Sequence, residues 1–126
     1  MVKRATLVII AMISTLGLSS FKSDANENDE VKTSYVSYYH EKFDGRRTAS
    51  GAVFSNRKLT AAHRTLPFGT KVKLTNPKTG ESVVVTINDR GPFHPGRAMD
   101  ISKAAFDSIG NPDSGILAIE YQVVGE

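Results

Sequence analysis

Alternation of apolar and polar residues in two neighbouring segments, 70–76 and 81–88, limits the fold of this chain more than any other feature. A period of two residues is typical of a β-strand with one face buried and the other in water. The four residues between the segments, Pro-Lys-Thr-Gly, favour a tight turn. We therefore expect a β-hairpin over 70–88, with a core face formed by Val72, Leu74, Val83, Val85 and Ile87.

Two further segments have the character of strands. Residues 34–40 are rich in aromatic and β-branched side chains, which strands favour. Residues 115–124 alternate again, which would bury Ile119, Tyr121 and Val123 and expose the polar side chains between them. These segments add at least two strands to the hairpin.

One helix is expected over residues 102–110. Ser102 is an N-cap residue type and Gly110 a residue that ends helices. Ala105, Phe106 and Ile109 would face the core at helical spacing. Residues 44–69 have little regular pattern, so the expected architecture is a small, mainly β domain with one short helix. Small β domains of this kind tend to close into a barrel, which hides their edges.

The N-terminal part of the chain predicts export. A positive start is followed by a 14-residue apolar run from Ala5 to Leu18, and a membrane-spanning helix needs roughly 20 such residues. We therefore expect a signal peptide over 1–25, an acidic linker over 26–33 and a folded domain over 34–126. The expected location is the cell envelope, either the periplasm or the secreted fraction, with no stable membrane anchor after the signal peptide is removed. The chain has no cysteine, so neither a disulfide nor a lipid-bearing thiol is available.

Charge and motif content exclude several function classes. The chain carries a net charge of +3, and removal of residues 1–25 would leave 13 basic and 12 acidic side chains, which does not indicate nucleic-acid binding. His40, His63 and His94 are scattered without metal-ligand spacing, and no phosphate-binding or dinucleotide-binding motif occurs. We therefore expect neither a metal nor a cofactor.

Residues 87–106, INDRGPFHPGRAMDISKAAF, hold more charge than a turn requires. One interpretation makes Asp100 a general acid in a groove. The other is structural: an ion pair of Asp100 with Arg90, or of Asp89 with Arg97, would hold a loop in place. The hydroxyl and amide side chains of 44–69 allow two readings as well, contact with an uncharged glycan or local turn chemistry.

Three blocks of the sequence together resemble one known family. They are SYVSYYHEKFDGRRTASG, LTAAHRTLPFGTKVKLTN and VVVTINDRGPFHPGRAMDISKAAF, and they closely resemble the rare lipoprotein A-like proteins of the bacterial envelope. The resemblance covers roughly residues 34–125. It implies a six-stranded double-psi β-barrel with one short helix, a fold similar to that of expansins.

The resemblance also implies a function and a site. The family comprises lytic transglycosylases that cleave the glycan strands of peptidoglycan endolytically and leave 1,6-anhydro ends. Asp100, in the sequence MDIS, falls on the position of the acid, and His63 would assist it. In this family the charged loop lines one side of a groove. Asp89, Arg90 and Arg97 would fix that loop, and Asp100 would point into the groove. The expected substrate-binding residues are Tyr39, Thr48, Ser50, Asp89 and Arg90.

One departure from the family pattern keeps a second function open. The family commonly carries a glutamate after the sequence TASG, and this chain has Ala52 there. That loss favours the alternative of a non-catalytic, expansin-like module that binds cell-wall glycan. Peptidoglycan glycan strands are the expected partner in either case.

Overall fold

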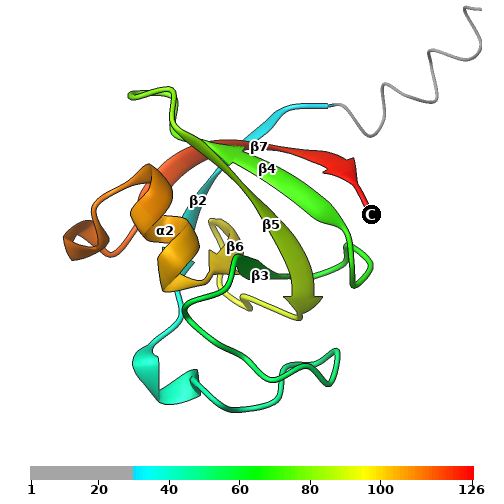
Figure 1. Ribbon diagram of the computed structural model, residues 1–126. Helices are drawn as coiled ribbons and strands as arrows, with labels where there is room; N and C mark the ends of the chain where they lie inside the picture. The colour runs from blue at the N-terminus through cyan, green and yellow to red at the C-terminus, as the bar shows by residue number, and fades with distance from the viewer. Residues whose placement is uncertain (1–29) are drawn as a thin grey trace, which may run out of the picture. The chain divides into compact units, whose positions relative to one another are not determined.

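The computed structural model describes residues 30–126, which form a six-stranded closed β-barrel with one α-helix (Figure 1). The spatial order of the strands around the barrel is β2-β6-β3-β5-β4-β7. Their bounds are β2 Lys32–Tyr38, β3 Thr60–His63, β4 Lys71–Thr75, β5 Ser82–Asp89, β6 Arg97–Ile101 and β7 Leu117–Gly125. The predicted fold class is confirmed.

The hairpin predicted over 70–88 is present as the antiparallel pair β4–β5. Val72 lies opposite Val85 and Leu74 opposite Val83, as the alternation requires. Strand β7 then pairs antiparallel with both β4 and β2, and these two pairings close the barrel. Because every strand has a neighbour on each side, no edge is left to pair with another chain.

Strands β3 and β6 were not predicted. β3 is four residues long and lies in the segment without regular pattern, and β6 lies inside the charged segment 87–106. Each is held from both sides: β3 pairs parallel with β5 and antiparallel with β6, and β6 also pairs parallel with β2. Their strand conformation therefore depends on neighbours distant in sequence rather than on a local period.

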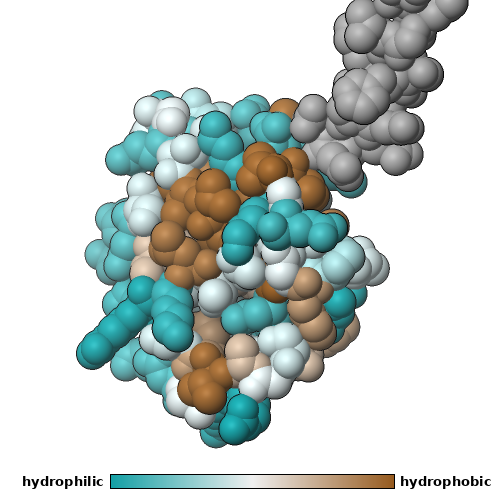
Figure 2. Space-filling model, turned by 45° about the vertical axis from the view of Figure 1, so that its right-hand side comes forward, coloured by the Kyte–Doolittle hydropathy of each residue, from teal (hydrophilic) through white to brown (hydrophobic). Residues whose placement is uncertain are grey.

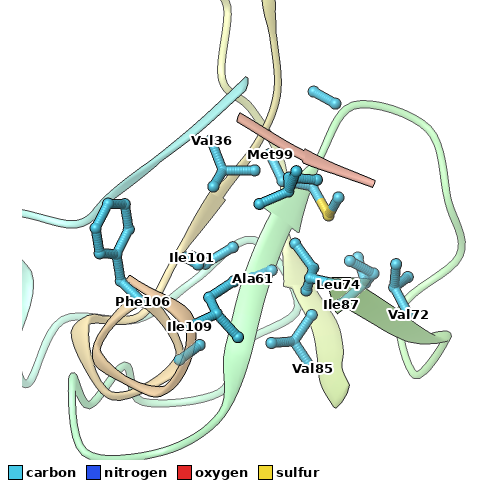
Figure 3. Close-up of a cluster of buried hydrophobic side chains, with 13 residues drawn as sticks. Val36, Ala61, Val72, Leu74, Val85, Ile87, Met99, Ile101, Phe106 and Ile109 are labelled. Carbon is cyan, nitrogen blue, oxygen red and sulfur yellow. The ribbon is translucent and has the colours of Figure 1, made fainter. Parts of the chain in front are cut away.

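The helix, α2 (Lys103–Ile109), covers one side of the barrel core (Figures 1 and 3). The Ser102 hydroxyl oxygen accepts a hydrogen bond from the Ala105 amide at 3.3 Å, so the predicted N-cap is confirmed. Phe106 is fully buried and meets the Tyr38 ring edge to face, with centroids 4.9 Å apart. The other fully buried side chains of the core include Val36, Ala61, Val72, Leu74, Val85, Ile87, Met99 and Ile101 from five strands and Ile109 from α2, and β7 contributes Ile119 at 2% exposure.

A long segment joins β2 to β3 and extends from one end of the barrel (Figure 1). It includes the 3₁₀-helix η1 (Glu41–Phe43), and a second 3₁₀-helix, η2 (Pro112–Ser114), precedes β7. On the face drawn in Figure 2, apolar residues gather in patches among hydrophilic ones. Within residues 30–126, no helix is long and apolar enough to cross a membrane.

The predicted signal peptide, residues 1–25, lies outside the described residues, as does most of the predicted linker, 26–33. Strand β2 begins at Lys32, two residues before the expected start of the domain at Ser34.

Candidate active site

Four residues form a row across four adjacent strands of the barrel. Ser37 on β2 is the register partner of Asp100 on β6. Asp100 pairs on its other side with Ala62 on β3, and Ala62 pairs with Asp89 on β5. Register partners on adjacent strands share one face of a sheet. The neighbours in sequence, Val36 and Ile101, are fully buried in the core, so this row lies on the outer face of the barrel.

Asp100, the predicted acid, is held through one of its two carboxylate oxygens. The Ser37 hydroxyl donates a hydrogen bond to Oδ1 at 2.9 Å, and Arg97 Nε lies 3.3 Å from the same atom. The Asp100 side chain is 26% exposed. No residue of the described part of the chain makes a hydrogen bond to Oδ2.

A β-bulge explains how Arg97 reaches Asp100. Residues three apart in a regular strand point to opposite faces. The β2–β6 register shifts after Tyr35, so that β6 carries one extra residue, Ala98, between Arg97 and Met99. Bulges of this kind re-aim side chains, and here Arg97 comes to the face of Asp100. The extra amide is not left unpaired, because the Ser34 hydroxyl oxygen accepts a hydrogen bond from Ala98 N at 3.0 Å.

The structural interpretation of the charged segment, an ion pair of Asp100 with Arg90 or of Asp89 with Arg97, is therefore wrong about which residues pair. Asp100 pairs with Arg97 instead of Arg90. Asp89 pairs with no arginine side chain among residues 30–126. Both alternatives assumed that charges pair across the loop, whereas the bulge brings together two charges three residues apart on one strand.

Asp89 is fully engaged in holding its surroundings. Its Oδ2 accepts a hydrogen bond from the Tyr39 hydroxyl at 2.6 Å, and its Oδ1 accepts from the Ala49 amide at 2.8 Å and the Arg90 amide at 2.9 Å. Three donors on one carboxylate fix the loop that precedes β3 against the end of β5. Both oxygens of the Asp89 carboxylate are therefore occupied by donors of the protein itself.

Arg90 is used in the same way. Its Nη1 donates to the carbonyl oxygens of Leu66 at 2.8 Å and His63 at 3.2 Å, and its guanidinium lies 4.1 Å from the centroid of the Phe68 ring. The arginine thus holds the turn after β3. Asp89 and Arg90 of the charged segment thus bond to the loops that flank the row.

Tyr39, Thr48 and Ser50 lie together beside Asp89. The Tyr39 ring stacks on Phe54 at 4.2 Å, and burial together with the hydrogen bond to Asp89 raises the pKa of its hydroxyl. The hydroxyl groups of Thr48 and Ser50 are 3.0 Å apart, and Thr48 also donates to the Ala52 carbonyl at 3.2 Å. Ser50 is exposed and Thr48 is buried, so of the two only the Ser50 hydroxyl faces solvent. The contacts of Thr48 and Ser50 are local turn hydrogen bonds, the second of the two interpretations given for the hydroxyl side chains of residues 44–69.

His63 does not share the face of Asp100. It ends β3 opposite Met99, whereas its neighbour Ala62 is the partner of Asp100. The amides of Thr65 and Leu66 both donate to its Nδ1, each at 3.1 Å, which places the ring proton on Nε2. Burial lowers the pKa of His63, and the charges of Arg64, Arg90 and Lys32 lower it further. The imidazole is therefore neutral near pH 7, oriented by the turn after β3.

Ser37 was missed by the sequence reasoning, although it donates a hydrogen bond to the candidate acid. It is 63 residues from Asp100 in sequence, and only the parallel β2–β6 pairing brings the two together. Since β6 was not predicted, no local pattern could have indicated this contact. Among the described residues, no group of three or more His, Cys, Asp or Glu side chains could hold a metal ion.

Comparison with known proteins identifies the family. A double-psi β-barrel model described as "Lytic transglycolase" matches residues 31–121. The chain belongs to this lytic transglycolase family. Within it, a Synechocystis protein named "Probable endolytic peptidoglycan transglycosylase RlpA" is 52% identical over 94 residues, which are 75% of this chain and 29% of that protein. The Haemophilus influenzae "Endolytic peptidoglycan transglycosylase RlpA" is 46% identical over 103 residues, 82% of this chain and 36% of that protein. The chain thus spans about a third of the length of these relatives.

Solved structures confirm the fold that this family model implies. The Streptomyces papain inhibitor superposes with a TM-score of 0.63 at 22% identity, covering 75% of this chain and 94% of that protein. A Clavibacter michiganensis expansin variant, solved in complex with cellohexaose, superposes with a TM-score of 0.59 at 22% identity, covering 75% of this chain and 50% of that one. At these identities the likeness concerns the fold alone.

Proposed function

We propose that this domain is an endolytic lytic transglycosylase that cleaves the glycan strands of peptidoglycan between N-acetylmuramic acid and N-acetylglucosamine. The observation that carries the proposal is the state of Asp100: its Oδ1 is held by Ser37 and Arg97, and it lies on an outer face of the barrel. A partly exposed carboxyl group with one oxygen held in place suits proton transfer to a bound polymer. Membership of the lytic transglycolase family and the names of the relatives support the same reaction.

In the proposed mechanism, the Asp100 carboxyl donates its proton to the glycosidic oxygen while the bond from that oxygen to C1 of the muramic residue breaks. The C6 hydroxyl of the same residue then attacks C1 and closes the 1,6-anhydro ring. Its proton passes to the Asp100 carboxylate, which restores the acid. Because the nucleophile belongs to the substrate, a single carboxyl group can act first as acid and then as base, unlike the two carboxylates of most glycosidases.

The other predicted site residues take separate roles in this proposal. Asp89, Arg90 and Tyr39 hold the loops that border the site, since their polar groups bond to protein partners. Ser50 is exposed and can meet a sugar hydroxyl. His63 keeps a neutral ring with its proton on Nε2, which makes it a hydrogen-bond donor at the end of β3. We place the domain outside the cytoplasm, exported by a signal peptide over 1–25 and joined to it by the linker 26–33.

A non-catalytic module that binds cell-wall glycan is the second candidate function, and one observation favours it. Ala52 is exposed at the position where the family commonly has glutamate, so no carboxylate stands there to support Asp100. Such a module would use the same outer face for binding alone.

Digestion of purified sacculi separates the two functions. We expect the protein to release fragments with 1,6-anhydro ends, detected by mass spectrometry. Asp100→Asn should abolish release, because the amide cannot donate a titrating proton, and should leave the circular dichroism spectrum and melting temperature close to those of the parent. Release at the parental rate by Asp100→Asn would remove Asp100 from the mechanism. Binding of sacculi without release by either protein would establish the binding module.

A further inference from the structure

A surface cavity of about 630 Å³ lies on the barrel beside the row that contains Asp100. This volume falls within the range of about 300–1,000 Å³ that is usual for small-ligand sites. Three adjacent strands, β7, β2 and β6, form its floor. Its lining includes Tyr35, Arg64, Arg97, Ala98, Ala118 and Glu120. None of the site residues predicted from the sequence lines it.

The cavity continues the candidate active site along β2. Tyr35 and Ser37 lie two residues apart and so point to the same outer face, about 7 Å from one another along the strand. Arg97 joins the two regions, since it lines the cavity and contacts Asp100 at 3.3 Å. A polymer that presents one bond to Asp100 and follows β2 would enter the cavity with its next units.

The floor of the cavity presents an exposed aromatic ring, Tyr35, beside a small side chain on β7. Tyr35 is 53% exposed, and its partner on β7 is Ala118. On the β6 side, the register partner of Tyr35 is Arg97, and the bulge places the buried Ala98 next to it in the cavity wall. One face of a pyranose ring carries mostly C–H groups, and an exposed aromatic ring with an alanine on one side is a surface on which that face can pack.

The charged groups at the rim favour an uncharged ligand. Arg64 Nη1 already donates to the carbonyl oxygens of Pro92 at 2.7 Å and Arg97 at 3.0 Å, and Arg97 pairs with Asp100. Glu120 lines the same cavity and would repel a carboxylate. Hydroxyl and acetamido groups, by contrast, can bond to a carboxylate and a guanidinium alike.

From these observations we propose that the cavity beside Tyr35 is a second sugar subsite, which binds one N-acetylhexosamine unit of the glycan strand beyond the unit that contacts Asp100. This inference rests on the proposed function for the identity of the polymer. Tyr35 is a substrate-binding residue in it, and the β6 bulge builds the site by placing Ala98 in the cavity wall and turning Arg97 toward Asp100.

Titration of the Asp100→Asn protein with the hexasaccharide of N-acetylglucosamine tests the subsite without any cleavage. Amide resonances of Tyr35, Ala98 and Ala118 should shift on binding. Replacing the ring in Tyr35→Thr, which keeps a residue that favours strands, should weaken binding roughly 3- to 10-fold, the range expected for loss of one aromatic contact.

Two control variants belong to this titration. Tyr35→Phe keeps the ring and should keep the parental affinity. Val84→Ala removes a side chain that is 43% exposed on β5 and does not line the cavity, and it should change nothing. Parental affinity in Tyr35→Thr, or unshifted amides at Ala98 and Ala118, would overturn the subsite.

Parallel assays on sacculi keep this inference separate from the proposed function. Binding that depends on Tyr35, with no anhydro products from the parent protein, would refute the reaction and leave the subsite standing. Cleavage that Tyr35→Thr leaves unchanged in KM would refute the subsite and leave the reaction. Binding lost in Arg64→Gln but retained in Tyr35→Thr would show that the cavity takes an acidic substituent instead, which also overturns the proposal.

Discussion

Asp100 makes both of its side-chain contacts through Oδ1, and the two partners reach it in different ways. Ser37 arrives through the parallel pairing of β2 with β6, and Arg97 through the bulge in β6 itself. The hydrogen bond from the Ser37 hydroxyl and the ion pair with the Arg97 guanidinium both act on this oxygen, which restricts the orientation of the carboxyl group. Proton transfer requires a donor in a defined position, so these residues are expected to act through Asp100 as positioning residues.

The first prediction at the scale of single residues concerns the replacement of Ala52 by glutamate. The Ala52 side chain is exposed, and its loop is anchored next to the row by the hydrogen bond from the Ala49 amide to Asp89. Ala52→Glu therefore adds a carboxylate at the edge of the site without disturbing a packed position. A proton-transfer group is typically worth about 10²–10⁴-fold in rate. We expect Ala52→Glu to release anhydro fragments much faster than the parent, with binding of sacculi little changed.

The matched control for this variant is Ala52→Gln, which has the same size and no titrating group. A similar gain in both variants would mean that the effect comes from hydrogen bonding to the sugar. No gain in Ala52→Glu, combined with good cleavage by the parent, would show that this chain uses Asp100 without the family's glutamate.

His63 predicts a dependence of stability on pH. Its pKa in the folded protein is lowered from the ordinary value of 6.5, with burial as the main cause. As pH falls below about 6.5, the unfolded chain takes up this proton before the folded one does, so stability is lost on acidification and regained toward neutral pH. The melting temperature of the parent should therefore fall more steeply between about pH 7 and pH 5 than that of His63→Asn.

Asparagine suits this comparison because its side-chain oxygen can still accept the hydrogen bonds from the Thr65 and Leu66 amides that now end on the His63 ring. If the two proteins lost melting temperature in parallel over this range, the ring would not be the group responsible.

At the scale of structural elements, Asp89 connects the end of β5 to the loop before β3. Asp89→Ala would leave the Tyr39 hydroxyl and the amides of Ala49 and Arg90 without their acceptor. Unsatisfied donors of this kind cost about 1–3 kcal/mol when they are shielded from water. We expect the free energy of unfolding to fall by about that amount, and the Ala49 amide to exchange with deuterium faster than in the parent.

Asp107→Ala supplies the control for charge, since Asp107 is exposed on α2 and its side chain accepts no hydrogen bond from residues 30–126. Its stability should stay within about 0.5 kcal/mol of the parent. A loss of cleavage in Asp89→Ala without any loss of stability would instead make Asp89 part of the reaction.

The elements also divide into those that the sequence predicts and those that it does not. The β4–β5 hairpin and α2 carry their own periods and caps, and both were predicted within two residues. β3 and β6 are short, and they form because each lies between two other strands. The candidate acid lies on β6, so its position came from resemblance to a family. Its contacts with Ser37 and Arg97 depend on the β2–β6 register and on the bulge in β6, and no local sequence pattern predicts either feature.

At the scale of the whole molecule, side chains along each barrel strand alternate between the core and the outer face. Val36, Ile101 and Ala61 point inward to the common core, while their neighbours Ser37, Asp100 and Ala62 form the outer row. Ser37 and Asp100 therefore take no part in filling the core, whereas Ala62 between them and Asp89 is buried at 2% exposure. The positions of Ser37 and Asp100 still depend on the core, because the core fixes the register of the strands that carry them.

The last prediction tests how far the site depends on the core, through Phe106. This ring is fully buried, packs against Tyr38 of β2, and belongs to the helix that follows β6 directly. Removing such a ring costs about 3–5 kcal/mol, against a total stability of about 5–15 kcal/mol for a domain. Phe106→Ala should therefore lower the urea midpoint severely. Phe93→Ala is the matched control, since Phe93 is 83% exposed, and its midpoint should stay at the parental value. Because the barrel has one core, Phe106→Ala should lose cleavage and fold together across the same urea range. Separate transitions for activity and for far-ultraviolet circular dichroism would show that the outer row can be disordered while the barrel stays closed.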